Sequence, residues 1–224
     1  MADPTESRAL RTLVDIVESG RPLVYIRSAE EQRVTTLLRE TADRCFSSAV
    51  PLWTWSLTEG MRRDDGTGGE LLGPRAALDF IATYDGRAFF LLKDFHEPMR
   101  EAPDVRRRLR DLYELCFDRG KFLIICSPVK FIPEEIERAI VYVELAVPDL
   151  DELVGFLRRE ATVITASGGR LDADEATLFQ LGRALQGLTF DETRHAIRRA
   201  VMLFLCSVRT LSQQRTKVLC SASR

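Results

Sequence analysis

The hydrophobic pattern of this chain switches between short continuous apolar runs and apolar positions at helical spacing, which is typical of an α/β protein. Five runs predict strands at 23–26, 50–57, 88–92, 122–126 and 140–146. The runs at 88–92 and 122–126 are apolar at every residue, so we expect central strands covered on both faces. The pattern predicts a five-stranded, parallel, doubly wound sheet with right-handed crossovers.

Helices are predicted before and between these strands. Their inward positions are Leu10, Leu13, Val14 and Val17 in the first helix, Ala77, Leu78 and Ile81 in a helix near Pro74, and Val105, Leu109, Leu112 and Cys116 in a helix over 105–117. Another helix follows the first strand almost at once, where Ser28 and Glu31 fit the S-x-x-E pattern of a capping box. The segment 58–69, rich in glycine and charge, is expected to be a mobile surface loop.

After Pro148 the pattern predicts helices only, so we expect a small helical lid. Three capping-box patterns support it, namely Asp149 with Glu152, Asp172 with Glu175, and Thr189 with Glu192. From residue 207 onward the chain has four basic residues, no acidic residue and no amphipathic face, so this tail is expected to be disordered. The expected organisation is an α/β domain over 1–148, a lid over 149–206 and a tail over 207–224.

Composition and charge narrow the class of protein. The 224 residues are 45% hydrophobic and 29% charged, which fits a folded globular chain. The formal net charge is −2 and no segment is strongly basic, so nucleic acid is not an expected partner. No apolar run approaches the roughly 18 residues of a membrane span, and the start does not resemble a signal peptide. We therefore expect a cytoplasmic protein without a membrane partner.

The five cysteines are far apart in the sequence and form no C-x-x-C pair. With only two histidines to complete a site, this spacing argues against zinc and against a disulfide framework. Cys116 and Cys126 are expected to be buried as small hydrophobic residues.

Five strands followed by a helical lid is also the plan of an AAA-type ATPase module. Six separated motifs follow one another along the chain, namely PLVYIRSAEEQRV, PLWTWSLTEG, FFLLKDFH, LIICSPVKFIPEEIE, PDLDEL and GLTFDET. On these motifs the sequence over residues 8–205 resembles the amino-terminal half of the AAA ATPase family named for a conserved open reading frame of chloroplast genomes, which has members in cyanobacteria and other bacteria. In that family a degenerate AAA-like domain precedes an ATPase domain that keeps the nucleotide motifs. The resemblance implies the strand order 5-1-4-3-2 and a chain truncated before the catalytic half.

A nucleotide site of this kind needs the P-loop motif G-x-x-x-x-G-K-[ST] between the first strand and its helix, so that backbone N–H groups surround the phosphates. The sequence contains no such motif, and the connection is only about two residues long. We expect Ser28 to cap the helix and Glu30 and Glu31 to occupy its first turn, where carboxylates favour the helix dipole and repel phosphate. A capped helix is favoured over a hidden nucleotide site.

Two further residues, each at the end of a predicted strand, correspond to site positions of such ATPases. Asp94 follows the third strand, where such ATPases hold magnesium through an Asp-Glu pair, but its neighbours Lys93 and Phe95 cannot polarise a water. Ser127 ends the fourth strand at the position of a γ-phosphate sensor, and a turn before Pro128 is the alternative interpretation. The candidate degenerate nucleotide site is therefore Ser28, Glu30, Glu31, Asp94 and Ser127, with no catalytic residue and no metal ligand.

Other chemical interpretations fit less well. The glycine cluster in 60–69 has no Lys in a GK[ST] position. A phosphoacceptor receiver domain would need acidic residues at the end of the first strand, where this chain has Arg27 and Ser28. His96 and His195 lack a nearby nucleophile motif, so surface or packing roles are expected. The arginines of 105–117 are interspersed with acidic residues, which favours a solvated helix face over an arginine finger or a docking patch.

Two functions follow from these observations. The first is a non-catalytic, AAA-like interaction domain that packs beside an ATPase domain or in a homo-oligomer, with no cofactor of its own. The second is an ATP-binding or ATP-hydrolysing enzyme, and the resemblance implies that its activity, with ATP and magnesium, resides in the downstream half of the intact protein.

Overall fold

The computed structural model describes residues 7–166 and 174–201. It divides the chain into two compact units, Met1–Ala146 and Val147–Arg224, which are described separately. The tail predicted to be disordered after residue 207 lies outside the described residues.

The first unit is built on a mixed sheet of seven strands. These are β1 (Leu23–Arg27), β2 (Leu52–Ser56), β3 (Gly60–Arg63), β4 (Gly69–Glu70), β5 (Ala88–Lys93), β6 (Lys121–Ser127) and β7 (Ile140–Glu144). Their spatial order is β4-β3-β2-β5-β6-β1-β7. The five predicted strands are parallel and have the order 5-1-4-3-2, with Phe89 opposite Phe122 in β5 and β6. The prediction of only five strands is wrong, because β3 and β4 extend the sheet in antiparallel orientation.

This antiparallel extension lies in the segment that was predicted to be a mobile surface loop. Gly60 opens β3 with a φ of +68°, in the left-handed region that glycine adopts without a side-chain clash. Met61, which follows it, is buried against the sheet. The segment was misjudged because its glycines and charges lower its strand propensity, whereas backbone pairing to the edge of β2 stabilises it.

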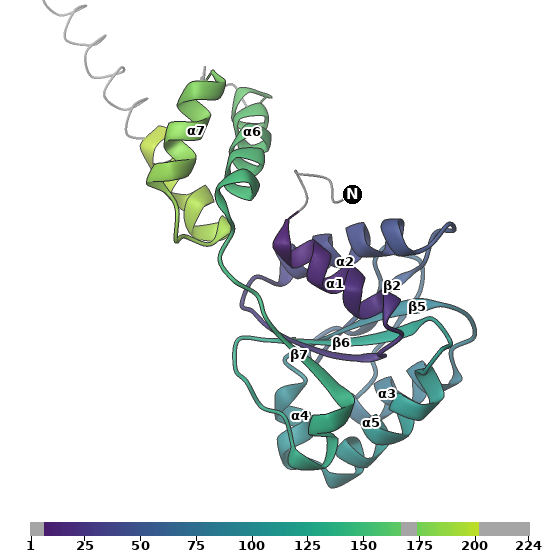
Figure 1. The fold of residues 1–224 in the computed structure, drawn as a ribbon. Coiled ribbons are helices and arrows are strands. Elements are labelled where there is room, and N and C mark those ends of the chain that lie inside the picture. The colour runs from purple at the N-terminus through teal and green to yellow at the C-terminus, as the bar shows by residue number, and fades with distance from the viewer. Residues whose placement is uncertain (1–6, 167–173, 202–224) are drawn as a thin grey trace, which may run out of the picture. The chain divides into compact units, whose positions relative to one another are not determined.

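Helices cover both faces of this sheet, which gives the first unit three layers (Figure 1). One face carries α1 (Arg8–Glu18) and α2 (Glu31–Cys45), and the other carries α3 (Pro74–Thr83), α4 (His96–Glu101), α5 (Pro103–Cys116) and the 3-10 helix η1 (Glu134–Ala139). The predicted inward residues are buried at Leu10, Leu13, Ala77, Leu78, Ile81, Val105, Leu109, Leu112 and Cys116, and partly buried at Val14 and Val17. The short helix α4 was not predicted.

The second unit contains α6 (Leu150–Ala166), α7 (Glu175–Ala184) and a helix over 190–201 within the described residues. Its core is formed by Leu157, Ile164, Leu178 and Ile197. The described part of the chain contains no helix that is both long enough and apolar enough to span a membrane.

Two of the predicted caps in this unit form as expected. Asp149 and Glu152 exchange reciprocal side-chain to backbone hydrogen bonds of 2.9 and 3.0 Å, and Thr189 and Glu192 form the second capping box. Of the third predicted capping box, Asp172 lies outside the described residues. The N-cap of α7 is Asp174, whose carboxylate accepts the N–H of Thr177 at 2.8 Å.

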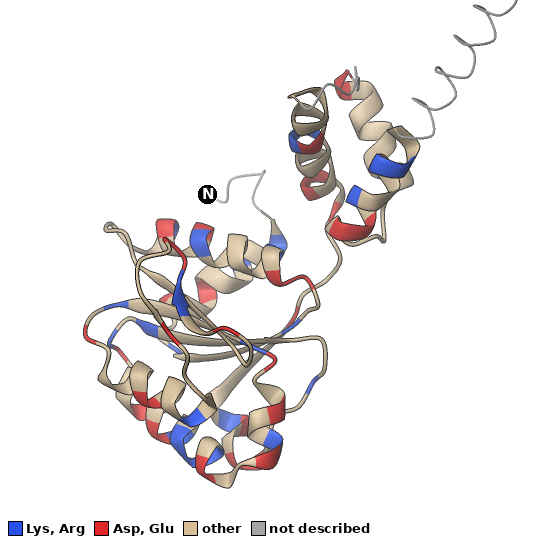
Figure 2. Ribbon diagram, turned by 180° about the vertical axis from the view of Figure 1, so that it is seen from behind, with Lys and Arg blue, Asp and Glu red and all other residues tan. Residues whose placement is uncertain are grey.

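Basic and acidic residues are interspersed along the helices of the first unit (Figure 2). Three arginines of α5 form the ion pairs Arg106–Glu135, Arg107–Asp111 and Arg108–Asp79. Pairs of this partly exposed kind contribute little to stability individually, and they agree with the predicted solvated face.

Candidate functional site

The candidate site lies where β1, β5 and β6 end side by side. Arg27 at the end of β1 is in register with Ser127 at the end of β6. The backbone N–H of Ser28 donates to the carbonyl of Ser127 at 2.9 Å, and that of Asp94 donates to the carbonyl of Cys126 at 2.9 Å. The parallel sheet therefore brings together the three predicted strand-end positions Ser28, Asp94 and Ser127.

The connection from β1 to α2 consists of residues 28–30. The hydroxyl of Ser28 accepts the backbone N–H of Glu30 at 3.0 Å and does not cap the helix. The N-cap is Glu30, with no side-chain cap bond, and the Glu31 carboxylate pairs instead with Lys93 Nζ at 2.7 Å. The predicted Ser28–Glu31 capping box is therefore wrong. A Ser bonded two residues ahead closes a local turn that competes with capping.

Glu30 and Arg33 form an ion pair in the first turn of α2. Arg33 is 6% exposed, and its Nη1 lies 3.2 Å from Glu30 Oε2. The same nitrogen donates to the carbonyl oxygen of Ala146 at 2.7 Å. The side chains around the β1–α2 connection are thus bound to other groups of the protein.

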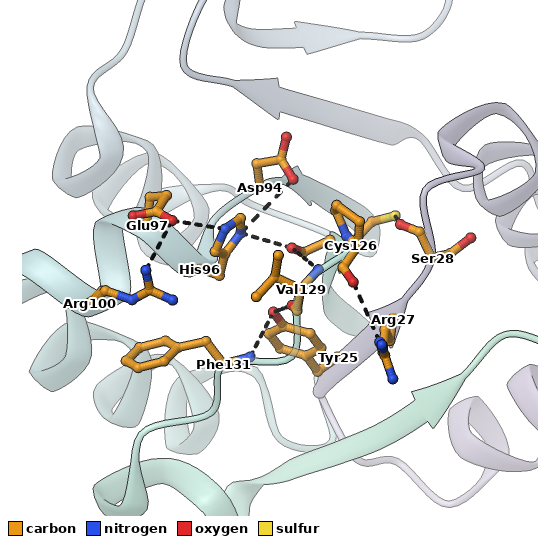
Figure 3. A network of polar contacts seen from close by, with 12 residues as sticks. Tyr25, Arg27, Ser28, Asp94, His96, Glu97, Arg100, Cys126, Val129 and Phe131 are labelled. Atoms are coloured by element: carbon orange, nitrogen blue, oxygen red, sulfur yellow. Dashed lines mark hydrogen bonds and ion pairs between the residues drawn. The ribbon is translucent and has the colours of Figure 1, made fainter.

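The hydroxyl of Ser127 is hydrogen-bonded to His96, which Figure 3 shows joined by dashed lines to Asp94 and Glu97. His96 Nδ1 lies 2.8 Å from Ser127 Oγ, and His96 Nε2 lies 3.1 Å from Glu97 Oε1. Ser127 Oγ also accepts the backbone N–H of Val129 at 3.1 Å. An imidazole that carries its proton on Nε2 satisfies both contacts, because it donates to Glu97 and accepts from the Ser127 hydroxyl.

Asp94 occupies the turn between β5 and α4. Its φ of +50° is in the left-handed region, which Asp tolerates better than most residues, and its carbonyl accepts the N–H of Glu97 at 3.3 Å. One carboxylate oxygen lies 3.9 Å from His96 Nδ1. The residues on either side of Asp94 are Lys93, which pairs with Glu31, and Phe95, so no second carboxylate is adjacent to Asp94 in the sequence.

Two further side chains beside this network, those of Tyr25 and Cys126, are hydrogen-bonded to the backbone. The Tyr25 hydroxyl donates to the carbonyl of Val129 at 2.5 Å and accepts the N–H of Phe131 at 3.3 Å, while burial raises the pKa of Tyr25. The Cys126 thiol contacts the carbonyl of Ser28 at 3.6 Å, and burial raises its pKa to about 12. Both groups stay protonated at neutral pH and act as hydrogen-bond donors.

These residues do not fit magnesium and ATP. A triphosphate needs several free backbone N–H groups and a cation, whereas the short connection presents Glu30 and Glu31, and Lys93 is paired with Glu31. Within residues 7–166 and 174–201, no group of three or more His, Cys, Asp or Glu side chains is arranged to hold a metal ion.

His96 and Arg33 are the site residues that sequence reasoning missed. His96 was expected to have a surface or packing role. It is 7% exposed, which agrees with packing, but its hydrogen bond to the predicted site residue Ser127 was not foreseen. Its position two residues after Asp94 at a strand end was the available signal. No signal in the sequence pointed to Arg33, because its partner Ala146 is 113 residues away.

The order of the five parallel strands, 5-1-4-3-2, is the one that the resemblance to AAA-type ATPases implied. A family model described as the N-terminal domain of SpoVK-like AAA ATPases matches residues 9–145, and one described as their second domain matches residues 151–203. The chain belongs to the SpoVK-like AAA ATPase family.

Two relatives agree with the resemblance found in the sequence, which is thereby confirmed. The AAA domain-containing protein ycf46 of Trieres chinensis is 24% identical over 215 residues, covering 95% of this chain and 41% of that protein. The ycf46 protein of Guillardia theta is 26% identical over 192 residues, covering 84% and 36%. The chain spans about two fifths of the length of these relatives.

Solved structures are similar in fold. A variant of Thermotoga maritima RuvB superposes with a TM-score of 0.57 at 13% identity, covering 89% of this chain and 63% of that one. Domain III of the Thermotoga maritima replication initiation protein DnaA gives a TM-score of 0.53 at 16% identity, covering 92% and 87%. At these identities the similarity concerns the fold alone.

Proposed function

We propose that this chain is a non-catalytic, AAA-like interaction domain that packs against an ATPase domain or against further copies of itself. The observation that carries the proposal is the bond between Ser127 and His96. The hydroxyl at the position of a γ-phosphate sensor is held by a buried side chain of the same chain, so it is already engaged without a nucleotide.

The neighbouring residues support the same proposal. Glu30 and Glu31 place two carboxylates at the start of α2, where a phosphate would otherwise bind, and each is paired within the chain. Phosphoryl transfer depends on positioning and on cationic stabilisation of the transferred group. Ser28, Asp94 and Ser127 then serve as structural residues of a degenerate nucleotide site.

The organisation of the chain follows from this proposal. Residues 1–148 form the AAA-like domain and 149–206 the helical lid.

A second candidate function, ATP binding or hydrolysis, is favoured by membership of an AAA ATPase family. We assign that activity, with its ATP and magnesium, to parts of the intact family protein that this chain does not contain.

Titration calorimetry of the purified chain with ATP and magnesium tests the proposal. We expect a dissociation constant weaker than about 1 mM, which corresponds to less than about 4 kcal/mol of binding free energy, and no ATP turnover above background. Micromolar affinity abolished by Asp94→Ala would overturn the proposal. Micromolar affinity unaffected by Asp94→Ala would overturn it too, and would locate the nucleotide at another site.

Sedimentation velocity over a range of concentrations tests the assembly role separately. We expect concentration-dependent self-association, or association with a separately expressed ATPase domain of the family. A chain that stays monomeric and binds no such domain contradicts an interaction role even if it binds no ATP.

A further inference from the structure

Two consecutive residues after β7, Leu145 and Ala146, are hydrogen-bonded to other parts of the first unit. The backbone N–H of Leu145 donates to the carbonyl of Arg27 at 3.2 Å, which continues the pairing of β7 with β1. The carbonyl of the next residue, Ala146, accepts Arg33 Nη1 at 2.7 Å. The second hydrogen bond differs from the first in its donor, which is a buried side chain of α2 and not the backbone of a strand.

The charge on Arg33 is stabilised where it is buried. Its side chain is 4% exposed, and that of its partner Glu30 is 12% exposed. A buried guanidinium that lost its carboxylate or its carbonyl acceptor would leave a desolvated charge, which is far more costly than losing an exposed pair. The pair therefore holds the guanidinium in one position.

The chain is anchored again shortly after Ala146. Asp149 forms the capping box at the start of α6 with Glu152. Between the two anchors lie only Val147, which is 49% exposed, and Pro148, which is buried and whose ring fixes φ. The anchors at Ala146 and Asp149 are thus separated by two residues, one of which is a proline.

We propose that Arg33 is a positioning residue that anchors the chain at Ala146, where the first unit ends. The anchor uses only groups of this chain, because the Glu30 carboxylate pairs with the guanidinium in the first turn of α2. The chain is therefore held at Ala146 without any nucleotide. This inference concerns the anchor itself and does not rest on the proposed interaction role.

Hydrogen exchange of the full chain, followed by mass spectrometry, tests the anchor. Arg33→Met keeps an apolar stem but removes the guanidinium. We expect the amides of 145–147 to exchange at least about tenfold faster in this variant, because the free energy of local opening is lower. Peptides covering β5 should keep their protection. Unchanged exchange at 145–147 would overturn the proposal, as would acceleration there that only matches the acceleration in β5.

The matched control is Arg27→Met. Arg27 also reaches the end of β7, where its Nη1 lies 3.0 Å from Glu144 Oε1, but this pair is exposed. We expect the exchange at 145–147 to change by less than about twofold in this variant. An acceleration equal to that in Arg33→Met would assign the effect to general loss of charge near β7 and overturn the proposal.

Two further measurements cover the case in which Arg33→Met does not fold. Glu30→Gln keeps the bond to Ala146 and weakens its support, so a smaller acceleration confined to 145–147 is expected, and none would contradict the proposal. In the unmodified chain, nitrogen-15 NMR should resolve separate, slowly rotating Nη signals for Arg33, and a single averaged signal would overturn it. Neither readout depends on ATP binding.

Discussion

Ser127 Oγ and His96 Nδ1 lie 2.8 Å apart, and this bond joins the carboxyl end of β6 to the first turn of α4. The same ring reaches Glu97 through Nε2 at 3.1 Å. His96 therefore connects a central strand to a helix of the adjoining layer with both nitrogens engaged. A buried imidazole with two partners stabilises one arrangement of these elements, because rotating it would break both contacts.

Replacing His96 by alanine should lower the free energy of unfolding of the first unit by about 1–3 kcal/mol, because the buried Ser127 hydroxyl loses its partner and a cavity remains. Urea unfolding followed by tryptophan fluorescence measures this, since both tryptophans of the chain, Trp53 and Trp55, belong to the first unit. The control Arg110→Ala changes an exposed side chain of the same unit and should have an effect within about 0.5 kcal/mol. Equal effects would contradict the structural role of the His96 bond.

The parallel part of the sheet could be predicted because its signal is local. The strands β5 and β6 are apolar at every central residue, and the structure buries them fully. The antiparallel strands β3 and β4 could not be predicted in this way, since Gly60, Arg62 and Gly69 have no apolar period. Their strand conformation depends on pairing with β2, which is a tertiary effect.

The candidate site, too, was predictable from the sequence only in part. The positions Ser28, Asp94 and Ser127 follow strand ends, so the sequence placed them together once the strand order was known. The bonds that occupy those positions were not predictable, because His96 is 31 residues from Ser127 and side-chain direction is not encoded in the apolar pattern. The Ser28–Glu31 prediction failed for a local reason, since Ser28 bonds to Glu30 and Glu31 turns to Lys93.

Gly60→Ala should destabilise the first unit far more than Gly66→Ala. Both glycines have positive φ, +68° and +75°, but a Cβ at Gly60 would lie 2.6 Å from the Cα of Leu71 and 2.7 Å from the N of Leu72, whereas Gly66 has open space. We expect about 1 kcal/mol for Gly66→Ala from backbone strain alone and about 3 kcal/mol or more for Gly60→Ala.

Fluorescence reports directly on this change. Trp55 Nε1 donates to the carbonyl of Leu72 at 2.8 Å, so displacement of Leu72 should alter the emission of Trp55 as well as the urea midpoint. If both alanine variants unfold at the same urea concentration, the close contact around Gly60 does not stabilise the antiparallel extension.

The stability of the first unit should fall above pH 9 because of its buried thiols. Burial raises the pKa of Cys126 to about 12 and that of Cys116 to about 11, from an ordinary value of 9.0. The folded state therefore keeps protons that the unfolded state releases. This contribution to stability is complete below about pH 9 and is lost as the pH rises toward the folded pKa values. Between pH 8 and pH 10 each buried thiol should reduce the free energy of unfolding by about 1.4 kcal/mol.

The variant Cys126→Ala isolates one of these thiols. It should unfold more easily than the unmodified chain at pH 8, because it removes buried apolar volume, yet its stability should fall by about 1.4 kcal/mol less between pH 8 and pH 10. Urea midpoints of the fluorescence transition at the two pH values give both quantities. Cys45→Ala is the comparison, since that thiol is only half-buried, and its effect on the pH dependence should be smaller. A Cys126→Ala variant with the same loss of stability as the unmodified chain would show that this thiol ionises as readily in the folded protein as in the unfolded one.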